Sequence, residues 1–256
     1  MSGHSHWQTI RRKKEANDAK RGAVFTKVAR EIVIAVREGG GGDPDTNIRL
    51  RMVLDKARSL GMPRDNVDRA IRRGTGEDKD AVEITEITYE GYGPNGVAIM
   101  IDVVTDNRNR AIAAVRHALS RAGGSIASPG AVAWQFDRKG AIHVPANVDF
   151  DMLFEAAVEA GAEDVVQGED EDDHIIYTDP TDLHAVSTYL KETANIEVTE
   201  ANLVLVPQNE LALDEKNAVQ VLKLISNLEE LDDVTQVFSN LEMSDEVMSA
   251  FESAFA

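Results

Sequence analysis

The stretch AVEITEITYEGYGPNGVAIMIDVVT, residues 81–105, marks a change in the hydrophobic period of the chain. Its first part, 81–92, alternates apolar and polar residues, which is typical of a half-buried strand. Its last part, 96–105, is almost continuously apolar and predicts a fully buried strand. The period upstream is helical, and helices and strands follow each other downstream, so we expect an α+β protein with a helical N-terminal domain.

Three helices are expected before this change of period. They run from Ala23 to the glycines at 39–42, from Asn47 to Gly61 and from Pro63 to Gly74. The third has proline at its start and glycine at its end, which is the usual asymmetry of helix termini. Its three arginines at 69, 72 and 73 are spaced to share one face, whereas its apolar residues face the other way.

After residue 105 the pattern continues with a helix that stops at the Gly123–Gly124 pair. AVAWQF and GAIHV are predicted strands joined by a DRKG turn, and the pattern then reads βαββαβ as far as IEVTEANLVLVP. A last helix over 215–228 and the strand DVTQVFS would complete the unfinished βαβ of 96–137. We therefore expect two ferredoxin-like α/β domains, one inserted into the other.

These patterns divide the chain into four predicted parts. The parts are a flexible basic arm (1–21), a helical N-terminal domain (22–78), a discontinuous α/β domain (79–139 with 207–256) and an inserted ferredoxin-like domain (140–206).

Positive charge is concentrated at the beginning of this acidic chain, whose formal net charge is −18. Residues 1–76 hold 17 Lys and Arg against 9 Asp and Glu, a net of +8, and residues 77–256 hold 10 against 36, a net of −26. Such asymmetry indicates a module that faces nucleic acid, attached to an acidic body. A basic helical surface that is merely solvated is the alternative.

Composition excludes several classes of protein. The chain has no cysteine, which removes disulfides, thiolate metal sites and cysteine nucleophiles. Arg11–Lys14 stand where the apolar part of a signal peptide would be, and no apolar run is long enough to cross a bilayer, so we expect a cytoplasmic protein without membrane contact.

No catalytic, cofactor or metal site is expected from the motifs. GYGPNG, residues 91–96, matches G-x-G-x-x-G, but a dinucleotide site needs a helix directly after the loop, and a strand pattern follows here. The acidic run EDEDDH, 169–174, is interpreted as a solvated turn between strands. No nucleophile, base and orienting group occur together, so the protein is predicted not to be an enzyme.

Several blocks of sequence resemble the signature blocks of one family. They are GHSHW, DAKRG, MPRDNVDRAIRRGTG, YEGYGPNGVA, TDNRNR and VAWQF, in this order along the chain. The chain is similar to members of the YebC family, probable transcriptional regulators of the YebC/PmpR type. That family also includes the mitochondrial translational activator of cytochrome c oxidase subunit I. The resemblance implies a helical N-terminal domain and two α/β domains, one interrupted by the other. His6 departs from the family, which usually has Lys there.

The candidate nucleic-acid contacts are basic side chains, two histidines and one tryptophan. Arg and Lys neutralise phosphates, and an aromatic side chain beside them suits stacking on an unpaired base. In TDNRNR, Asp106 or Asn107 is expected to cap a helix whose start, with two arginines, could hold an anion. The candidates are His4, His6, Trp7, Arg11, Arg12, Lys13, Lys14, Lys20, Arg21, Lys27, Arg30, Arg69, Arg72, Arg73, Arg108 and Arg110.

Three functions are compatible with these features. The first is a DNA-binding transcriptional regulator, and the second is a translation factor or translational activator that contacts ribosomal RNA. The third is a protein adaptor without a nucleic-acid role. The expected partners are therefore DNA or ribosomal RNA, together with the transcription machinery or the ribosome. The pattern does not predict the oligomeric state.

Overall fold

The structure is a computed structural model that describes residues 18–78, 82–168 and 173–253. The described residues form two compact units, 18–133 with 220–239 and 134–219 with 240–253, each considered by itself below. The helices are α2 (Asp18–Glu38), α3 (Ile48–Ser59), α4 (Arg64–Gly74), α5 (Arg108–Arg121), α6 (Phe150–Ala160), α7 (Leu183–Glu192), α8 (Glu215–Glu229) and α9 (Asp245–Ser253). The strands are β1 (Thr85–Tyr92), β2 (Ala98–Thr105), β3 (Ser125–Ile126), β4 (Phe136–Val144), β5 (Asp164–Val166), β6 (His174–Thr178), β7 (Glu200–Pro207) and β8 (Val234–Ser239).

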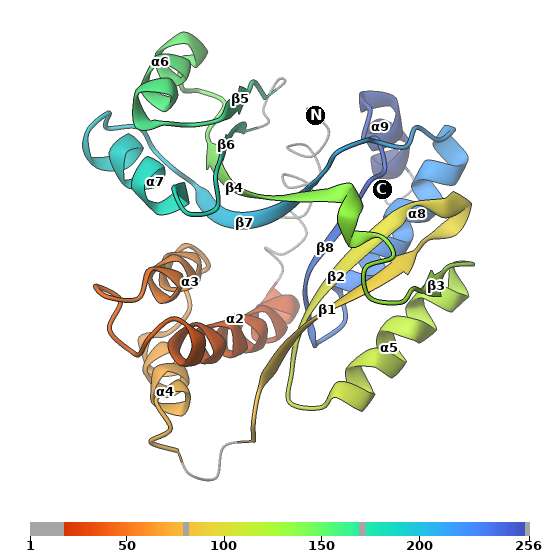
Figure 1. Ribbon diagram of the computed structural model, residues 1–256, viewed down its shortest axis with the longest axis horizontal. Helices are drawn as coiled ribbons and strands as arrows, with labels where there is room; N and C mark the ends of the chain where they lie inside the picture. The colour runs from red at the N-terminus through yellow and green to blue at the C-terminus, as the bar shows by residue number, and fades with distance from the viewer. Residues whose placement is uncertain (1–17, 79–81, 169–172, 254–256) are drawn as a thin grey trace. The chain divides into compact units, whose positions relative to one another are not determined.

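The three predicted N-terminal helices are confirmed within a few residues at each end. Helix α3 begins where the Asn47 side chain accepts a hydrogen bond from the Leu50 N–H at 2.9 Å. Pro63 stands directly before α4, where its missing N–H costs nothing. In Figure 1, α3 and α4 lie against α2, the longest of the three.

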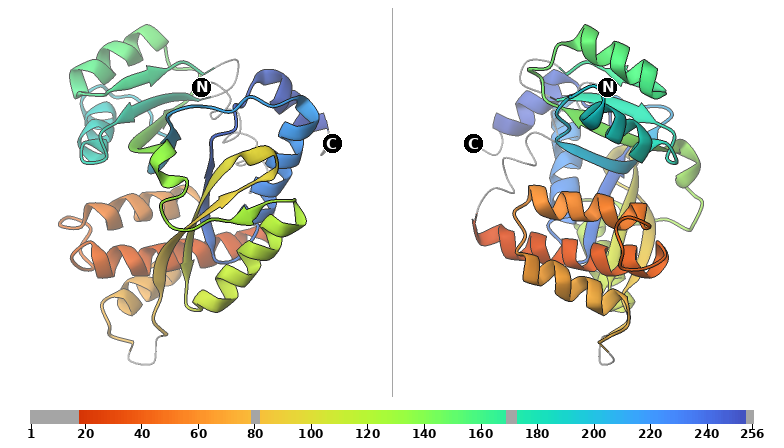
Figure 2. Two further views of the ribbon diagram at one scale, coloured as in Figure 1. Left: turned by 45° about the vertical axis from the view of Figure 1, so that its right-hand side comes forward. Right: turned by 90° about the vertical axis from the view of Figure 1, so that its left-hand side faces the viewer.

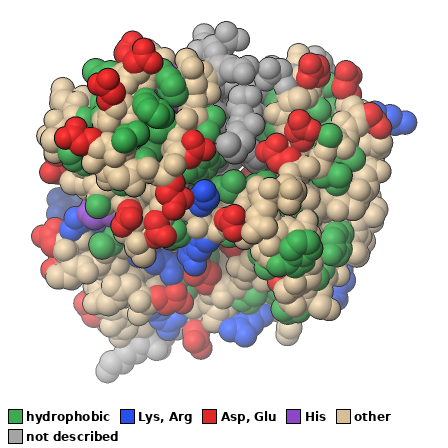
Figure 3. Space-filling view, turned by 45° about the horizontal axis from the view of Figure 1, so that its top comes forward, with side chains coloured by type: hydrophobic (Ala, Val, Ile, Leu, Met, Phe, Trp, Pro, Cys, Tyr) green, Lys and Arg blue, Asp and Glu red, His purple; other side chains and the backbone are tan. Residues whose placement is uncertain are grey.

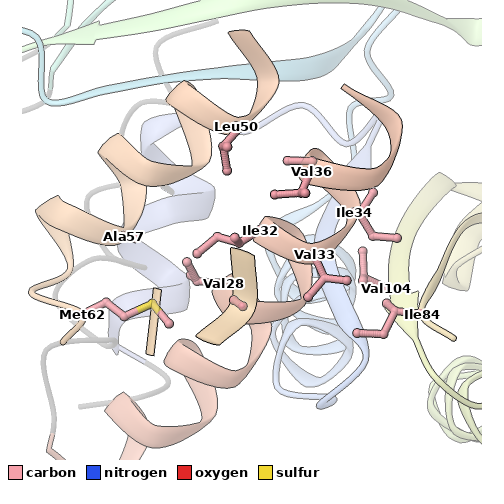
Figure 4. Close-up of a cluster of buried hydrophobic side chains, with 12 residues drawn as sticks. Val28, Ile32, Val33, Ile34, Val36, Leu50, Ala57, Met62, Ile84 and Val104 are labelled. Atoms are coloured by element: carbon pink, nitrogen blue, oxygen red, sulfur yellow. The ribbon is translucent and has the colours of Figure 1, made fainter. Parts of the chain in front are cut away.

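The helical region shares its hydrophobic core with strand β2. Val28, Ile32 and Val36 of α2 are buried in one cluster with Leu50 of α3, and Figure 4 shows their side chains gathered between the helices. Val104 of β2 belongs to the same cluster. The helices therefore complete their core only with the sheet, and removing the sheet would expose part of it.

The first sheet has the strand order β3-β1-β2-β8 and is antiparallel throughout. The predicted strands at 81–92 and 96–105 are confirmed as a hairpin whose register pairs Thr85 with Thr105 and Tyr92 with Ala98. Strand β8 adds to β2, as expected for a last strand that completes the first sheet. This is the ferredoxin-like order with one change in connectivity. The position of the third strand is taken by β1, which precedes β2 in the chain instead of following β3.

The second sheet has the order β5-β6-β4-β7, which is the ferredoxin-like order of a βαββαβ chain. Helices α6 and α7 pack against each other and cover one face of this sheet (Figure 2). Gly140 lies under α7, where a Cβ atom would stand 2.8 Å from the Leu183 Cβ. The glycine thus permits a close approach between helix and sheet.

The structure differs from the sequence interpretation in three details. DRKG is not a turn, because residues 136–144 form one continuous strand and Arg138 and Lys139 pair with Leu205 and Val204 of β7. The residues before it, Ala133–Gln135, form a short 3₁₀ turn instead of a strand. Helix α9 was not expected at all. Among the described residues, none of the helices is both long and apolar enough to cross a membrane.

Candidate nucleic-acid interface

The predicted contact residues fall into three groups. His4, His6, Trp7, Arg11, Arg12, Lys13 and Lys14 lie outside the described residues. Lys20 and Arg21 belong to α2, but their side chains are outside the description too. The described side chains are those of Lys27, Arg30, Arg69, Arg72, Arg73, Arg108 and Arg110, and all of them lie in the unit formed by 18–133 and 220–239.

Lys27 and Arg30, one turn apart on α2, both reach the corner between α8 and β8. The Lys27 ammonium donates a 2.6 Å hydrogen bond to the Glu229 carbonyl at the end of α8, where a positive charge also complements the helix dipole. Arg30 donates to the Asp232 carbonyl at 2.8 Å and to Asp233 Oδ1 at 3.0 Å. These two cations are thus engaged inside the molecule.

Arg110 is held by the same corner. Its guanidinium donates to both oxygens of Asp233, from Nε at 2.9 Å and from Nη2 at 2.7 Å, and also to Asp106 Oδ1 at 2.7 Å. The hydrogen bond from Arg110 holds the pKa of the Asp106 carboxyl below its usual range. The bonds to Asp233 and Asp106 raise the pKa of Arg110 in turn. The TDNRNR motif therefore places Arg110 mainly in an internal ion pair.

The start of α5 matches the predicted cap. Asn107 is the N-cap residue, and its Oδ1 accepts from the Arg110 N–H at 3.0 Å. Arg108 is exposed, and its Nε lies 3.3 Å from the Thr85 hydroxyl. Of the two arginines in this motif, Arg108 has the guanidinium that is open to solvent without a carboxylate partner among the described residues.

Helix α4 carries three closely spaced arginines that have no carboxylate partner among the described residues. Arg69 and Arg72 are exposed, and Arg72 donates only to the Asp68 carbonyl of its own helix, at 3.4 Å. Arg73 is half-buried and donates to the Val82 carbonyl at 3.1 Å. The aspartates of α4 stand in its first half and these arginines in its second. The C-terminal half of α4 is therefore a cationic surface, which we call the α4 arginine face: Arg69, Arg72 and Arg73.

The other cations of α3 and of its neighbourhood are paired. Arg49 bridges Glu38 and Glu86 at 2.7 and 2.8 Å, and Lys56 pairs with Glu31 at 2.9 Å. Arg51 and Arg58 also have aspartate partners. Arg64, at the start of α4, has a side chain that is 92% exposed and lies 3.9 Å from Asp68.

The described ranges contain no group of three or more His, Asp or Glu that could hold a metal ion. GYGPNG leads through a short turn at Pro94–Gly96 into β2, so a strand follows the loop where a dinucleotide site would need a helix. What the described residues bring together is thus a set of surface cations on an α+β scaffold.

This combination defines the class of the molecule: a helical region rich in arginine, joined to two ferredoxin-like sheets. Residues 5–77 match the model of the TACO1/YebC protein N-terminal domain, and residues 84–241 match that of the TACO1/YebC second and third domain. The chain belongs to the TACO1/YebC family.

Individual relatives are similar over nearly the whole chain. A probable transcriptional regulatory protein of Acidithiobacillus ferrooxidans (strain ATCC 53993 / BNL-5-31) is 49% identical over 99% of both chains. One from Chlorobaculum tepidum is 50% identical over 98% of this chain and 99% of the relative. The crystal structure of a conserved hypothetical protein from Aquifex aeolicus is 44% identical, with a TM-score of 0.83 over 90% of this chain and 93% of that one.

Proposed function

We propose that this protein is a non-enzymatic regulator of gene expression that binds nucleic acid through the α4 arginine face, together with the basic segment that precedes α2. Relatives of nearly equal length carry the name probable transcriptional regulatory protein, which supports a regulatory role. Duplex DNA is the first target that this name suggests.

The observation that carries the proposal is the unequal pairing of the cations. Lys27, Arg30 and Arg110 are engaged with the α8–β8 corner, and the cations of α3 have carboxylate partners. Arg69 and Arg72 have none among the described residues. A guanidinium already paired with a carboxylate gains little from a phosphate, whereas an unpaired and exposed one can form forked hydrogen bonds to it. The α4 arginine face is therefore where a phosphate backbone would be held.

The charge of the rest of the chain favours one orientation on a polyanion. Residues 134–219 hold 20 Asp and Glu against 4 Lys and Arg. A nucleic acid repels this part and attracts the helical region, so the protein would approach with its helices first.

The test uses the full chain, because the helices share their core with β2. We expect Arg69→Glu/Arg72→Glu to weaken binding to a labelled DNA duplex by about tenfold or more in low salt, since each lost charge-assisted contact costs about 1.5–3 kcal/mol. The matched control is Arg116→Glu/Arg121→Glu, which reverses the same number of exposed charges on α5. Equal affinity of the α4 variant and the control would contradict the proposal.

The same cations would also suit ribosomal RNA, so the assay needs a second arm. Pelleting of ribosomes in low salt, with the same two variants, measures association with RNA in its natural assembly. Binding to duplex DNA that exceeds ribosome association supports transcription as the level of regulation. If the protein instead binds ribosomes tightly and binds DNA without sequence preference, the α4 arginine face contacts ribosomal RNA and the protein regulates translation.

A further inference from the structure

Helix α6 exposes apolar side chains that its own unit does not cover. Three of the large hydrophobic side chains that are exposed in the described structure belong to this one helix: Met152 at 52%, Phe154 at 47% and Val158 at 58%. The helix is well formed, because Asp149 caps its start and Gly161, with φ 91°, ends it. These three apolar side chains are therefore exposed on a regular, capped helix.

The helix buries its opposite side normally. Leu153 and Ala157 are fully buried beneath it. Phe150 packs edge-on against His174 with ring centroids 5.5 Å apart, and the Phe154 ring lies 6.3 Å from that of Phe150. Phe154 thus borders the core without entering it. Because residues four apart lie above one another on a helix, Phe154 and Val158 form one apolar ridge.

Carboxylates follow this ridge along the helix. Asp151, Glu155 and Glu159 are exposed and spaced four apart, so they form a stripe between the ridge and Met152. None of the three has a Lys or Arg partner among the described residues, and α6 contains no basic residue. The Tyr189 hydroxyl of α7 bonds to Glu159, and that bond raises the pKa of the tyrosine. Figure 3 shows hydrophobic side chains lying among acidic ones over α6, at the upper left.

We propose that this surface, Met152, Phe154 and Val158 with Asp151, Glu155 and Glu159, docks a cationic amphipathic segment of a protein partner. Apolar side chains of the partner would pack on the ridge of Phe154 and Val158. Lys or Arg residues beside them would pair with the carboxylate stripe. The same stripe repels phosphate, which excludes nucleic acid as the occupant. It also repels a second copy of α6. The protein would then hold nucleic acid with its helical region and a basic protein with α6, an inference that goes beyond the proposed function and does not depend on it.

The experiment adds the full chain to a fluorescently labelled helical peptide made of Leu and Lys in amphipathic order. Binding is measured as the rise in the fluorescence anisotropy of the label. A peptide with Glu in place of Lys, and one with Ser in place of Leu, report the charge and the apolar requirement separately. We expect Phe154→Ser/Val158→Ser and Glu155→Lys/Glu159→Lys each to weaken binding of the Leu/Lys peptide by about tenfold, as is typical of central contacts at an interface.

General attraction to an acidic protein is controlled by Glu192→Lys/Glu197→Lys, which makes the same charge change at exposed positions elsewhere in this unit. This control is expected to change the affinity less than threefold. Equal weakening by the control and the α6 charge variant, or unchanged binding in the Phe154→Ser/Val158→Ser variant, overturns the proposal. Nucleic-acid binding of the α6 variants is measured in parallel, so that failure here is distinguishable from failure of the α4 arginine face.

Discussion

Asn47 is the residue at which three segments of the helical region meet. Its Oδ1 caps α3, while its amide nitrogen donates to the Ala35 carbonyl at 2.8 Å and to the Gly41 carbonyl at 2.7 Å. The residue is 1% exposed. Gly39 packs against it so closely that a Cβ there would stand 2.2 Å from Asn47 Oδ1. The end of α2, the glycine-rich loop and the start of α3 are therefore fixed by one amide.

We expect Asn47→Ala to lower the free energy of unfolding by about 2 kcal/mol, because it removes a helix cap and the two side-chain hydrogen bonds to the Ala35 and Gly41 carbonyls. Urea unfolding followed by circular dichroism measures this change. Thr46→Ala, at an exposed neighbouring position, is the control and should stay within about 0.5 kcal/mol of the parent. A loss no larger than that of the control would show that the amide does not join these segments.

Glu90 is a buried carboxylate that is held by backbone donors. Its oxygens accept from the N–H groups of Gly130, Val132 and Ala133 at 2.5, 2.8 and 3.0 Å. Burial alone would raise the pKa of Glu90, but these hydrogen bonds outweigh it and lower the pKa below its usual value. The ionised form therefore stabilises the folded state by anchoring the loop to β1.

A lowered pKa gives this stabilisation a definite pH dependence. It is fully present above the ordinary glutamate pKa of about 4.3 and is lost as the pH falls through the lower pKa of the folded state. Glu90→Gln should reduce stability at pH 7 by about 1–3 kcal/mol and show a smaller further loss between pH 5 and 3 than the parent. Denaturant melts at a series of pH values test this, and parallel pH profiles for parent and variant would refute it.

At the scale of elements, the corner between α8 and β8 receives side chains from two distant helices. Asp233 has 8% of its side chain exposed and accepts from Arg30 of α2 and from Arg110 of α5. The Arg110 partner lies 123 positions away in the chain. These ion pairs join α2 and α5 to the end of the sheet within one unit.

We expect Asp233→Asn to destabilise the protein by about 1–3 kcal/mol, because it removes the negative charge that the two guanidinium groups share and leaves one acceptor oxygen in place of two. Asp232→Asn is the matched control, since Asp232 is exposed and contributes its backbone carbonyl to Arg30. Thermal unfolding of both variants provides the comparison. Similar melting temperatures for Asp233→Asn and the control would rule out a structural role for the pair.

Most elements were predictable because their signals are local. Gly and Pro mark the ends of α3 and α4, and the change from helical period to alternation marks β1. DRKG misled because its polar residues and glycine are typical of a turn, whereas pairing with β7 keeps them in a strand. Tertiary pairing of this kind leaves no trace in four residues of sequence.

At the scale of the whole chain, the sequence showed that positive charge is concentrated in residues 1–76. It did not show which of these basic side chains are paired with carboxylates. In the sequence, Arg69 and Arg110 are both basic residues of predicted helices, and nothing distinguishes them. Only the fold shows that Arg110 has a carboxylate partner from a distant segment, while Arg69 has none among the described residues. The seven predicted residues between 4 and 14 stay predictions, because they lie outside the described ranges.

The most direct test of the central claim is the salt dependence of nucleic-acid binding by the full chain. The logarithm of the binding constant for a DNA duplex should fall linearly with the logarithm of the salt concentration, with a slope of about −0.9 per phosphate contact. We predict that Arg69→Gln/Arg72→Gln makes this slope shallower by about one to two units. An unchanged slope in that variant would contradict the assignment of the α4 arginine face to phosphate.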